Sequence, residues 1–175
     1  SIEGACRRAL ARIRETKGLV LIGPGMTMRR IKQTLHMEPT LLGVDAWQDG
    51  QQVGRDLPAT GILALLDQRS VEDAEPLLVV GVVGGQGFLF GRGNQQLSAD
   101  VLRRIGRERV VIVSSMEKLV ALPERRLFVD TGDEGVDAAL TGYLPVVIGE
   151  RQTVQVAVGA PVTAGSGGTG SPAPG

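Results

Sequence analysis

The sequence is poor in the residues that build cross-links and metal centres. Its 175 residues include one Cys and one His. A single Cys excludes a disulfide framework and a zinc site with several Cys ligands. A single His argues against a metal centre built from several His side chains. We therefore predict a fold that is held by its core alone, with no resident metal ion.

Long hydrophobic runs and an excess of charge of one sign are also missing. The longest apolar run, residues 77–83, is far shorter than the ~20 residues that cross a bilayer. No basic segment followed by an apolar one marks a secretory signal. We therefore expect a cytoplasmic protein without membrane contacts. Lys and Arg total 19, as do Asp and Glu, so the net charge is +0 and nucleic acid is not an expected partner.

Aromatic residues are scarce and glycine is abundant. Aromatic residues make up 3% of the chain, whereas 25 residues are Gly. The core must therefore consist of Val, Leu, Ile and Ala, and many glycines must serve turns and close backbone approaches. The length suits one domain, which we place at residues 1–159 as a nucleotide- or phosphate-binding α/β domain. Residues 160–175 contain mainly Gly, Ser, Thr, Pro and Ala, so we expect a disordered tail.

Between these limits, short apolar strands alternate with amphipathic helices. The pattern predicts helices at residues 2–16, after Thr27, after Pro58, after Ser98, at 114–122 with Ser114 and Glu117 as a capping box, and at 133–140. It predicts strands at 19–22, 41–45, 77–83, 110–113 and 127–130, a hairpin turn at Asp49-Gly50, and a C-terminal β-hairpin of strands 146–148 and 154–158. This order predicts an α/β, Rossmann-like fold, with a mostly parallel sheet and helices on both faces.

Ligands of such sheets bind beyond the carboxyl ends of the strands. After the first strand, Gly23, Gly25 and Thr27 form a turn into a helix, where free N–H groups attract an anion. Asp45 follows Gly25 by twenty residues, the position from which a carboxylate holds a ribose in dinucleotide folds. Met28 stands where the third Gly of that motif belongs, so a plain tight turn with a capping Asp is an equal alternative.

Residues 84–96 form a glycine-rich loop after the longest apolar run. Arg92 provides a donor fork for phosphate or carboxylate, and the amides that follow it suit a base or sugar edge. The candidate binding residues are Gly84, Gly85, Gln86, Gly87, Arg92, Gly93, Asn94, Gln95 and Gln96. The alternative is a flexible loop whose Phe88 and Phe90 both pack in the core.

A third polar cluster follows the strand at 127–130. Asp130, Thr131 and Asp133 surround a glycine turn and suit Mg²⁺ or a ribose. The same residue types are common helix N-caps, which is an equally good interpretation.

Four stretches together resemble the ATP-NAD kinase family, and within it the branch associated with acetoin catabolism. They read GGQGFLFGRGNQQLSADVLRRIG, LIGPGMTMRRIKQTL, TLLGVDAW and LFVDTGDEGVDAALTGYLPVVIGER. The resemblance covers Gly18 to Arg151. It implies a protein that transfers a phosphoryl group from ATP or polyphosphate to NAD and so forms NADP, with NAD as substrate and Mg²⁺ bound to ATP. It further implies that Arg92 and the helix after Gly25 hold phosphates.

The family's catalytic Gly-Gly-Asp-Gly motif is absent from this sequence. Residues 84–87 read Gly-Gly-Gln-Gly, and a Gln can neither accept a proton as a base nor bind metal as a carboxylate does. The resemblance is thus to the C-terminal half of the family, which contributes substrate contacts. Asp45, Asn94, Gln95 and Asp130 would then hold ribose or base, and the catalytic residue is unknown.

Two other roles fit the same residues. The turn at 23–27 is also similar to phosphate loops of sugar-phosphate isomerases and sugar-sensing regulators, which suggests a non-catalytic module that binds a sugar phosphate or nucleotide as effector. The strands within 144–158 suggest a homo-oligomer in which they pair across a two-fold axis.

Overall fold

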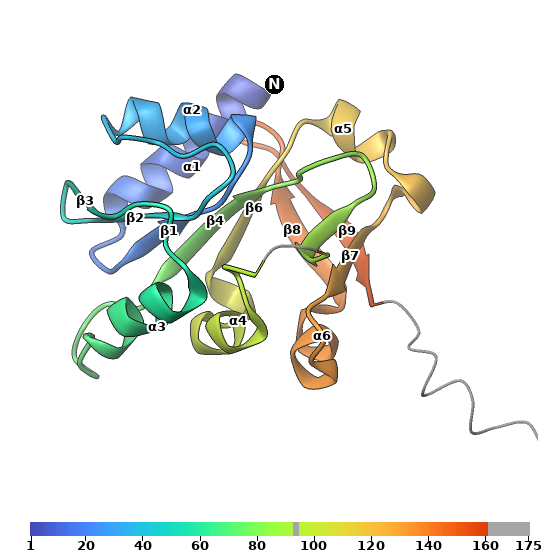
Figure 1. Ribbon diagram of the computed structural model, residues 1–175. Helices are drawn as coiled ribbons and strands as arrows, with labels where there is room; N and C mark the ends of the chain where they lie inside the picture. Colours follow the sequence, from blue (N-terminus) through green and yellow to red (C-terminus); the bar gives the residue numbers. More distant parts are fainter. Residues whose placement is uncertain (93–94, 161–175) are drawn as a thin grey trace, which may run out of the picture.

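The computed structural model describes residues 1–92 and 95–160, and in them a nine-stranded sheet is the central element (Figure 1). The strands lie in the order β3-β2-β1-β4-β6-β8-β9-β7-β5. Their bounds are β1 Val20–Ile22, β2 Asp45–Gln48, β3 Gln51–Gly54, β4 Leu77–Gly81, β5 Phe88–Gly91, β6 Val110–Val113, β7 Leu127–Asp130, β8 Gly142–Val147 and β9 Thr153–Gly159. The helices are α1 Ile2–Glu15, α2 Met26–Thr34, α3 Ala59–Asp67, α4 Ala99–Ile105, α5 Met116–Val120 and α6 Glu134–Leu140, with 3-10 turns at Arg107–Arg109 and Pro123–Arg125.

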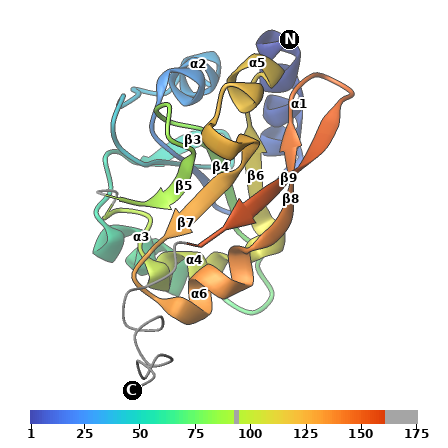
Figure 2. The same cartoon turned by 90° about the vertical axis from the view of Figure 1, so that its right-hand side faces the viewer.

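Most neighbouring strands of this sheet are parallel. β1, β4, β6 and β8 run parallel in succession, and so do β9, β7 and β5. β8 and β9 form the antiparallel hairpin that joins the two sets, and β2 and β3 form an antiparallel hairpin at the other end. Figure 2 shows the β8–β9 hairpin beside β7. The predicted mostly parallel α/β fold with a C-terminal β-hairpin is confirmed.

Alternate residues of the strands feed two hydrophobic cores. Val20 and Val79 pack with α1 and α2 in one core, whereas Leu21 and Val80 belong to the other. The second core continues through α3, α4 and α6 to β5, β7, β8 and β9. Figure 1 shows α1 and α2 on one side of the sheet and α3, α4 and α6 on the other. Helices thus cover both faces, as the sequence predicts.

The second strand differs from its prediction in both place and direction. We expected a strand at 41–45 that ends in Asp45, but β2 begins at Asp45 and runs antiparallel to β1. The backbone N–H of Gly25 donates to the carbonyl oxygen of Leu41 at 2.8 Å, which holds this segment beside the turn that follows β1. The chain therefore enters β2 at the carboxyl end of β1 and must run back along it.

The glycine-rich segment 84–96 is not a continuous loop, since it contains β5. Phe88 pairs with Phe128 and Gly91 with Asp130 in a parallel ladder with β7. Phe90 is buried in the core, whereas Phe88 is only half-buried. One smaller prediction is also wrong: Ser115, not Ser114, caps α5, with its side chain accepting from the N–H of Lys118.

The two C-terminal strands lie inside the sheet. β8 lies between β6 and β9, and β9 lies between β8 and β7, so the edge strands are β3 and β5. The ladders of β8 and β9 with their outer neighbours are short, since β8 pairs with β6 only at Val146 and Val147, and β9 pairs with β7 only at Val158 and Gly159. Homo-oligomer formation through these strands stays a prediction, which sedimentation at high concentration tests. The disorder expected for 160–175 falls outside the described residues, except for Ala160.

None of the helices between residues 1 and 160, with 93–94 set aside, has the length and hydropathy that a bilayer-spanning helix needs.

Candidate functional site

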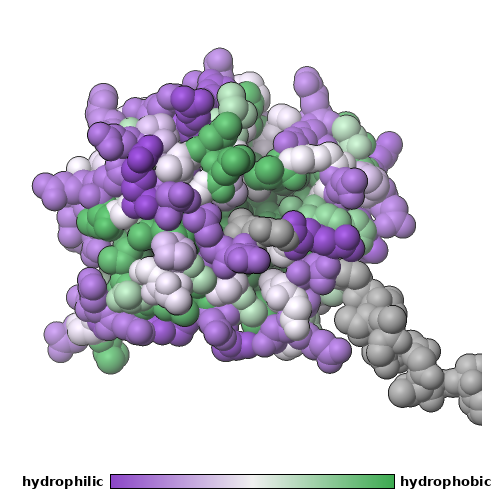
Figure 3. All heavy atoms as spheres, in the orientation of Figure 1, coloured by the Kyte–Doolittle hydropathy of each residue, from purple (hydrophilic) through white to green (hydrophobic). Residues whose placement is uncertain are grey.

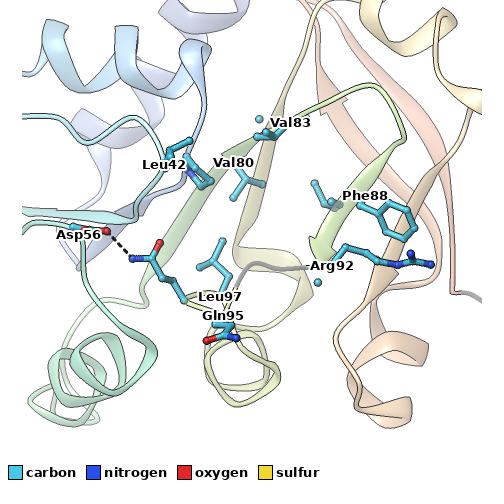
Figure 4. Close-up of a pocket in the computed structure, with 13 residues that line it drawn as sticks. Leu42, Asp56, Val80, Val83, Phe88, Arg92, Gln95 and Leu97 are labelled. Atoms are coloured by element: carbon cyan, nitrogen blue, oxygen red, sulfur yellow. Dashed lines mark hydrogen bonds between the residues drawn. The ribbon is translucent and has the colours of Figure 1, made fainter.

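A cleft of about 620 Å³ opens at the carboxyl end of β4. Its walls come from the segment before β2, the segment after β3, and β5 with the residues that follow it (Figure 4). The lining residues are Pro24, Leu42, Asp56, Val80, Gly81, Val83, Phe88, Leu89, Gly91, Arg92, Gln95, Gln96 and Leu97. Size and position are those of a small-molecule site in an open α/β sheet.

A second hollow of about 290 Å³ adjoins this cleft and shares Pro24, Leu42, Gly81 and Val83 with it. It reaches the first turn of α2, at Gly25 to Met28, and Lys118 of α5 also lines it. Met26 is 66% exposed and Leu42 is 82% exposed at its rim. Figure 3 shows hydrophobic surface gathered beside a hollow in this face of the molecule.

Behind the cleft wall lies a fully buried ion pair between Lys32 and Asp45. The Lys32 Nζ atom lies 2.9 Å from Asp45 Oδ2, and neither side chain has any exposed surface. Lys32 also donates to the carbonyl oxygens of Thr40 at 2.9 Å and Gly43 at 3.1 Å. Asp45 accepts from the N–H and the hydroxyl of Thr40 and, at 2.8 Å, from the N–H of Asp56. The pair thus fixes the two segments that form one side of the cleft.

Burial and hydrogen bonding act in opposite directions on the Asp45 carboxyl. Burial raises its pKa, but the backbone N–H groups of Thr40 and Asp56, together with the Lys32 ammonium, outweigh this and hold the pKa below its usual value. Burial also lowers the pKa of the Lys32 amine, and Asp45 opposes that shift. The carboxylate is therefore the ionised anchor of this network.

This shift predicts an acid-dependent loss of stability. Because the pKa of Asp45 is lower in the folded than in the unfolded state, the unfolded chain binds the proton more readily. The contribution of Asp45 is complete above the unfolded pKa of about 3.9 and falls as the pH drops through and below it. We expect the difference in the free energy of unfolding between wild type and Asp45→Asn to shrink from pH 6 to pH 3 in urea titrations. A difference that stays constant with pH contradicts the prediction.

Asp56 and Gln96 join the two sides of the cleft. The Gln96 Nε2 atom donates to Asp56 Oδ1 at 2.9 Å, as the dashed line in Figure 4 marks. The Gln96 Oε1 atom accepts from the N–H of Val44 at 3.1 Å. The side-chain amide thus ties the segment after β5 to the segments on either side of the β2–β3 hairpin.

Arg92 makes its contacts beside β7. Its Nε donates to Asp130 Oδ2 at 2.9 Å, and its guanidinium carbon lies 4.6 Å from the centre of the Phe88 ring. Phe88 in turn lies 5.7 Å from Phe128, over which Arg126 sits at 5.9 Å. Figure 4 shows the Arg92 side chain extending away from Val80 and Leu97, along the Phe88 ring. Arg92 borders the cleft, but its charge is balanced by Asp130.

The cluster after β7 caps a helix. The Asp133 carboxylate accepts from the N–H of Val136 at 2.9 Å and pairs with Arg103 at 2.6 Å. The hydrogen bond from Val136 and the nearby Arg103 charge lower the pKa of Asp133. The Thr131 hydroxyl donates to Asp137 at 2.6 Å. Over residues 1–92 and 95–160, no three Asp, Glu, His or Cys side chains are grouped as metal ligands. Asp133 is thus the N-cap of α6, as one of the two interpretations predicts.

Comparison with protein families places most of the chain in a known family. The family described as ATP-NAD kinase C-terminal domain matches residues 18–158. The chain belongs to this family. The match confirms the resemblance to the ATP-NAD kinase family and to its C-terminal half. The narrower resemblance to the acetoin-catabolism branch stays a prediction. Comparisons with curated proteins and with solved structures found no match.

In this ATP-NAD kinase C-terminal domain, only part of the predicted site comes together. Gly25, Thr27 and Gly84 line the smaller hollow, and Arg92, Gln95 and Gln96 line the larger cleft. The following residues line neither: Gly23, Asp45, Gly85, Gln86, Gly87, Asp130, Thr131 and Asp133. Gly93 and Asn94 lie outside the described residues. Asp45 is a correction, because a buried carboxylate whose oxygens accept from Lys32, Thr40 and Asp56 has no surface for a ribose.

Three residues near the site were missed by sequence reasoning. Asp56 and Lys118 belong to no sequence motif, because the residues that they face at the site are distant in the sequence. Lys32 did leave a signal. It follows Met28 by four residues and therefore lies on the same buried face of α2. A lysine at such a position needs a buried partner.

Proposed function

We propose that this chain provides the substrate-binding part of an NAD kinase-like protein and holds NAD in the 620 Å³ cleft while NAD is phosphorylated to NADP. The observation that carries the proposal is the cleft at the carboxyl ends of parallel strands, in a chain of the ATP-NAD kinase C-terminal domain family. The phosphoryl group would come from ATP, and Mg²⁺ would enter bound to ATP. The proposal places this chemistry in the cytoplasm.

Phosphates would bind in the smaller hollow. The first turn of α2 presents backbone N–H groups, and the helix dipole adds a partial positive charge there. The Thr27 hydroxyl and the Lys118 ammonium border the same space. These groups are suited to an anion, and their position beside the larger cleft suits a ligand that has both phosphates and a nucleoside.

The nucleoside would occupy the larger cleft. Gln95 brings a side-chain amide to its wall, whereas the Gln96 amide is held by Asp56 and Val44. Val80, Val83 and Leu97 provide an apolar surface for a ring. Amide groups donate and accept hydrogen bonds at once, which suits the edge of a base or sugar. We assign no catalytic residue to this chain, because the Gly-Gly-Asp-Gly motif is missing from its sequence.

A variant that fills the cleft tests the proposal. Val83 lines both cavities and is 48% exposed, so Val83→Arg should block the ligand without disturbing the core. Calorimetric titration with NAD should show binding to wild type and at least a tenfold loss in the variant, or about 1.4 kcal/mol. Val71→Arg is the matched control, since Val71 is fully exposed at 103% and lies outside both cavities. The control should bind NAD as wild type does.

Two results contradict the proposal. One is the absence of heat when millimolar NAD, NADP or Mg²⁺-ATP is added to wild type. The other is equal NAD affinity in wild type and Val83→Arg. The effector-binding alternative predicts a different pattern, in which sugar phosphates bind and nucleotides do not. The proximity of Lys118 to the first turn of α2 is the observation that favours this second candidate.

A further inference from the structure

Asp56 has an unusual backbone conformation at the wall of the cleft. Its φ is +47°, in the left-handed region that residues with side chains rarely adopt. The N–H of this residue donates to the buried Asp45 carboxylate at 2.8 Å. An Asp in this conformation is held by its surroundings, and such constraint gathers at functional sites.

The surroundings of Asp56 fix its side chain as well as its backbone. Gln96 Nε2 donates to Oδ1 at 2.9 Å, and Gln96 is itself tied to the N–H of Val44. Gly43 lies directly behind the carboxylate, and a Cβ atom there would collide with Oδ1. Lys32 and Asp45 hold this region from the core. The carboxylate is thus set in one place before any ligand arrives.

The charges of this cleft wall favour a ligand that presents an uncharged hydrogen-bond donor, such as a hydroxyl group. Among residues 1–92 and 95–160, Asp56 and Arg92 are the charged residues of the larger cleft, and the Arg92 guanidinium is paired with Asp130. Within the same residues no donor bonds Asp56 Oδ2. A carboxylate accepts hydrogen bonds from hydroxyl groups and repels phosphates. The wall is therefore suited to the hydroxyls of a sugar, while phosphates lie nearer Lys118.

We propose that Asp56, and not the expected Asp45, binds a ribose hydroxyl of the nucleotide in the cleft. Gln96 orients the carboxylate, and Asp45 positions it from behind. This inference rests on the proposed function, and it assigns recognition of the nucleotide's sugar to Asp56. Asp45 keeps the role of a positioning residue, because it contacts the Asp56 backbone and has no exposed surface.

The test measures affinity for NAD and for NAD analogues that lack one ribose hydroxyl, in wild type and Asp56→Asn. Asn tolerates the left-handed conformation, so the variant keeps the backbone and loses the charge. Wild type should bind at least one deoxy analogue about tenfold more weakly than NAD. Asp56→Asn should bind NAD as weakly as wild type binds that analogue, and should bind the analogue itself no more weakly than wild type does.

Asp49→Asn is the matched control. Asp49 also has a positive φ, of 52°, but it lies at the tip of the β2–β3 hairpin outside the cleft. The control should retain wild-type affinities. An equal loss for NAD and for every analogue in Asp56→Asn shows a structural role and overturns the inference, as does unchanged NAD affinity. If wild type binds NAD but Asp56→Asn is unaffected, the proposed function stands alone. If wild type binds no NAD, both fail.

Discussion

Replacing Lys32 by Met should lower the free energy of unfolding by about 3–5 kcal/mol. Met fills a similar volume, so the loss comes from the charge. The Asp45 carboxylate would remain fully buried without its counter-ion, and the carbonyl oxygens of Thr40 and Gly43 would lose their donor. Removing one member of a buried pair costs more than the pair itself contributes, because the remaining charge is unsolvated.

Urea unfolding of wild type and Lys32→Met measures this cost. Lys17→Met is the control, since Lys17 is exposed after α1 and its substitution should change stability by less than about 0.5 kcal/mol. Lys32→Met also tests the link to the cleft. Where this variant remains folded, the segment before β2 has lost the contacts of Lys32, so NAD affinity should fall too. A stability loss as small as that of Lys17→Met would show that Asp45 is satisfied without Lys32.

Local patterns predicted the elements whose reasons are local. The apolar stripe of α1, the Ser98 cap of α4 and the Asp49-Gly50 turn follow from residues a few positions apart. The mostly parallel sheet follows from the order of the elements. The cleft lies at the carboxyl ends of the parallel strands, where a ligand was expected, because the expected position depends only on strand direction.

Features that depend on distant partners were not predictable from one sequence. The hydrogen bond from Gly25 to Leu41 holds the segment before β2 beside the carboxyl end of β1, and the sequence spacing gives no sign of this contact. Twenty residues separate Gly25 from Asp45 whichever way the strand runs. The spacing therefore pointed to Asp45, whereas the reversed strand buries that carboxylate and brings Asp56 to the cleft.

The glycines of residues 84–93 looked like a single ligand-binding feature, but Gly91 has a separate structural reason. Its φ is +92°, and a Cβ atom would collide with the carbonyl oxygen of Asp130 on β7. Gly91 and Asp130 are register partners in the parallel ladder. The close approach of β5 and β7 therefore requires glycine here, whether or not a ligand binds.

Gly91→Ala should consequently lower the free energy of unfolding by about 3 kcal/mol or more. The left-handed backbone costs a side chain about 1–2 kcal/mol, and separating β5 from β7 adds the loss of packing around Phe90. Gly85→Ala is the matched control in the same segment, because nothing lies within 4 Å of its added Cβ and its φ is not positive. The control should leave the free energy of unfolding unchanged or raise it by up to about 1 kcal/mol, because Ala reduces the conformational entropy of the unfolded chain.

Denaturant unfolding of the two variants shows which of these glycines is required by strand packing. A large loss in Gly91→Ala with none in Gly85→Ala assigns Gly91 to strand packing. Similar small effects in both variants would contradict the close approach of β5 and β7 at Gly91. They would instead favour the glycine-rich loop that the sequence predicts for this segment. Because β5 carries Phe88 and leads into Gln95 and Gln96, a variant that loosens it should also lose NAD affinity in proportion to its unfolding. The stability of one strand contact and the shape of the cleft are then parts of the same measurement.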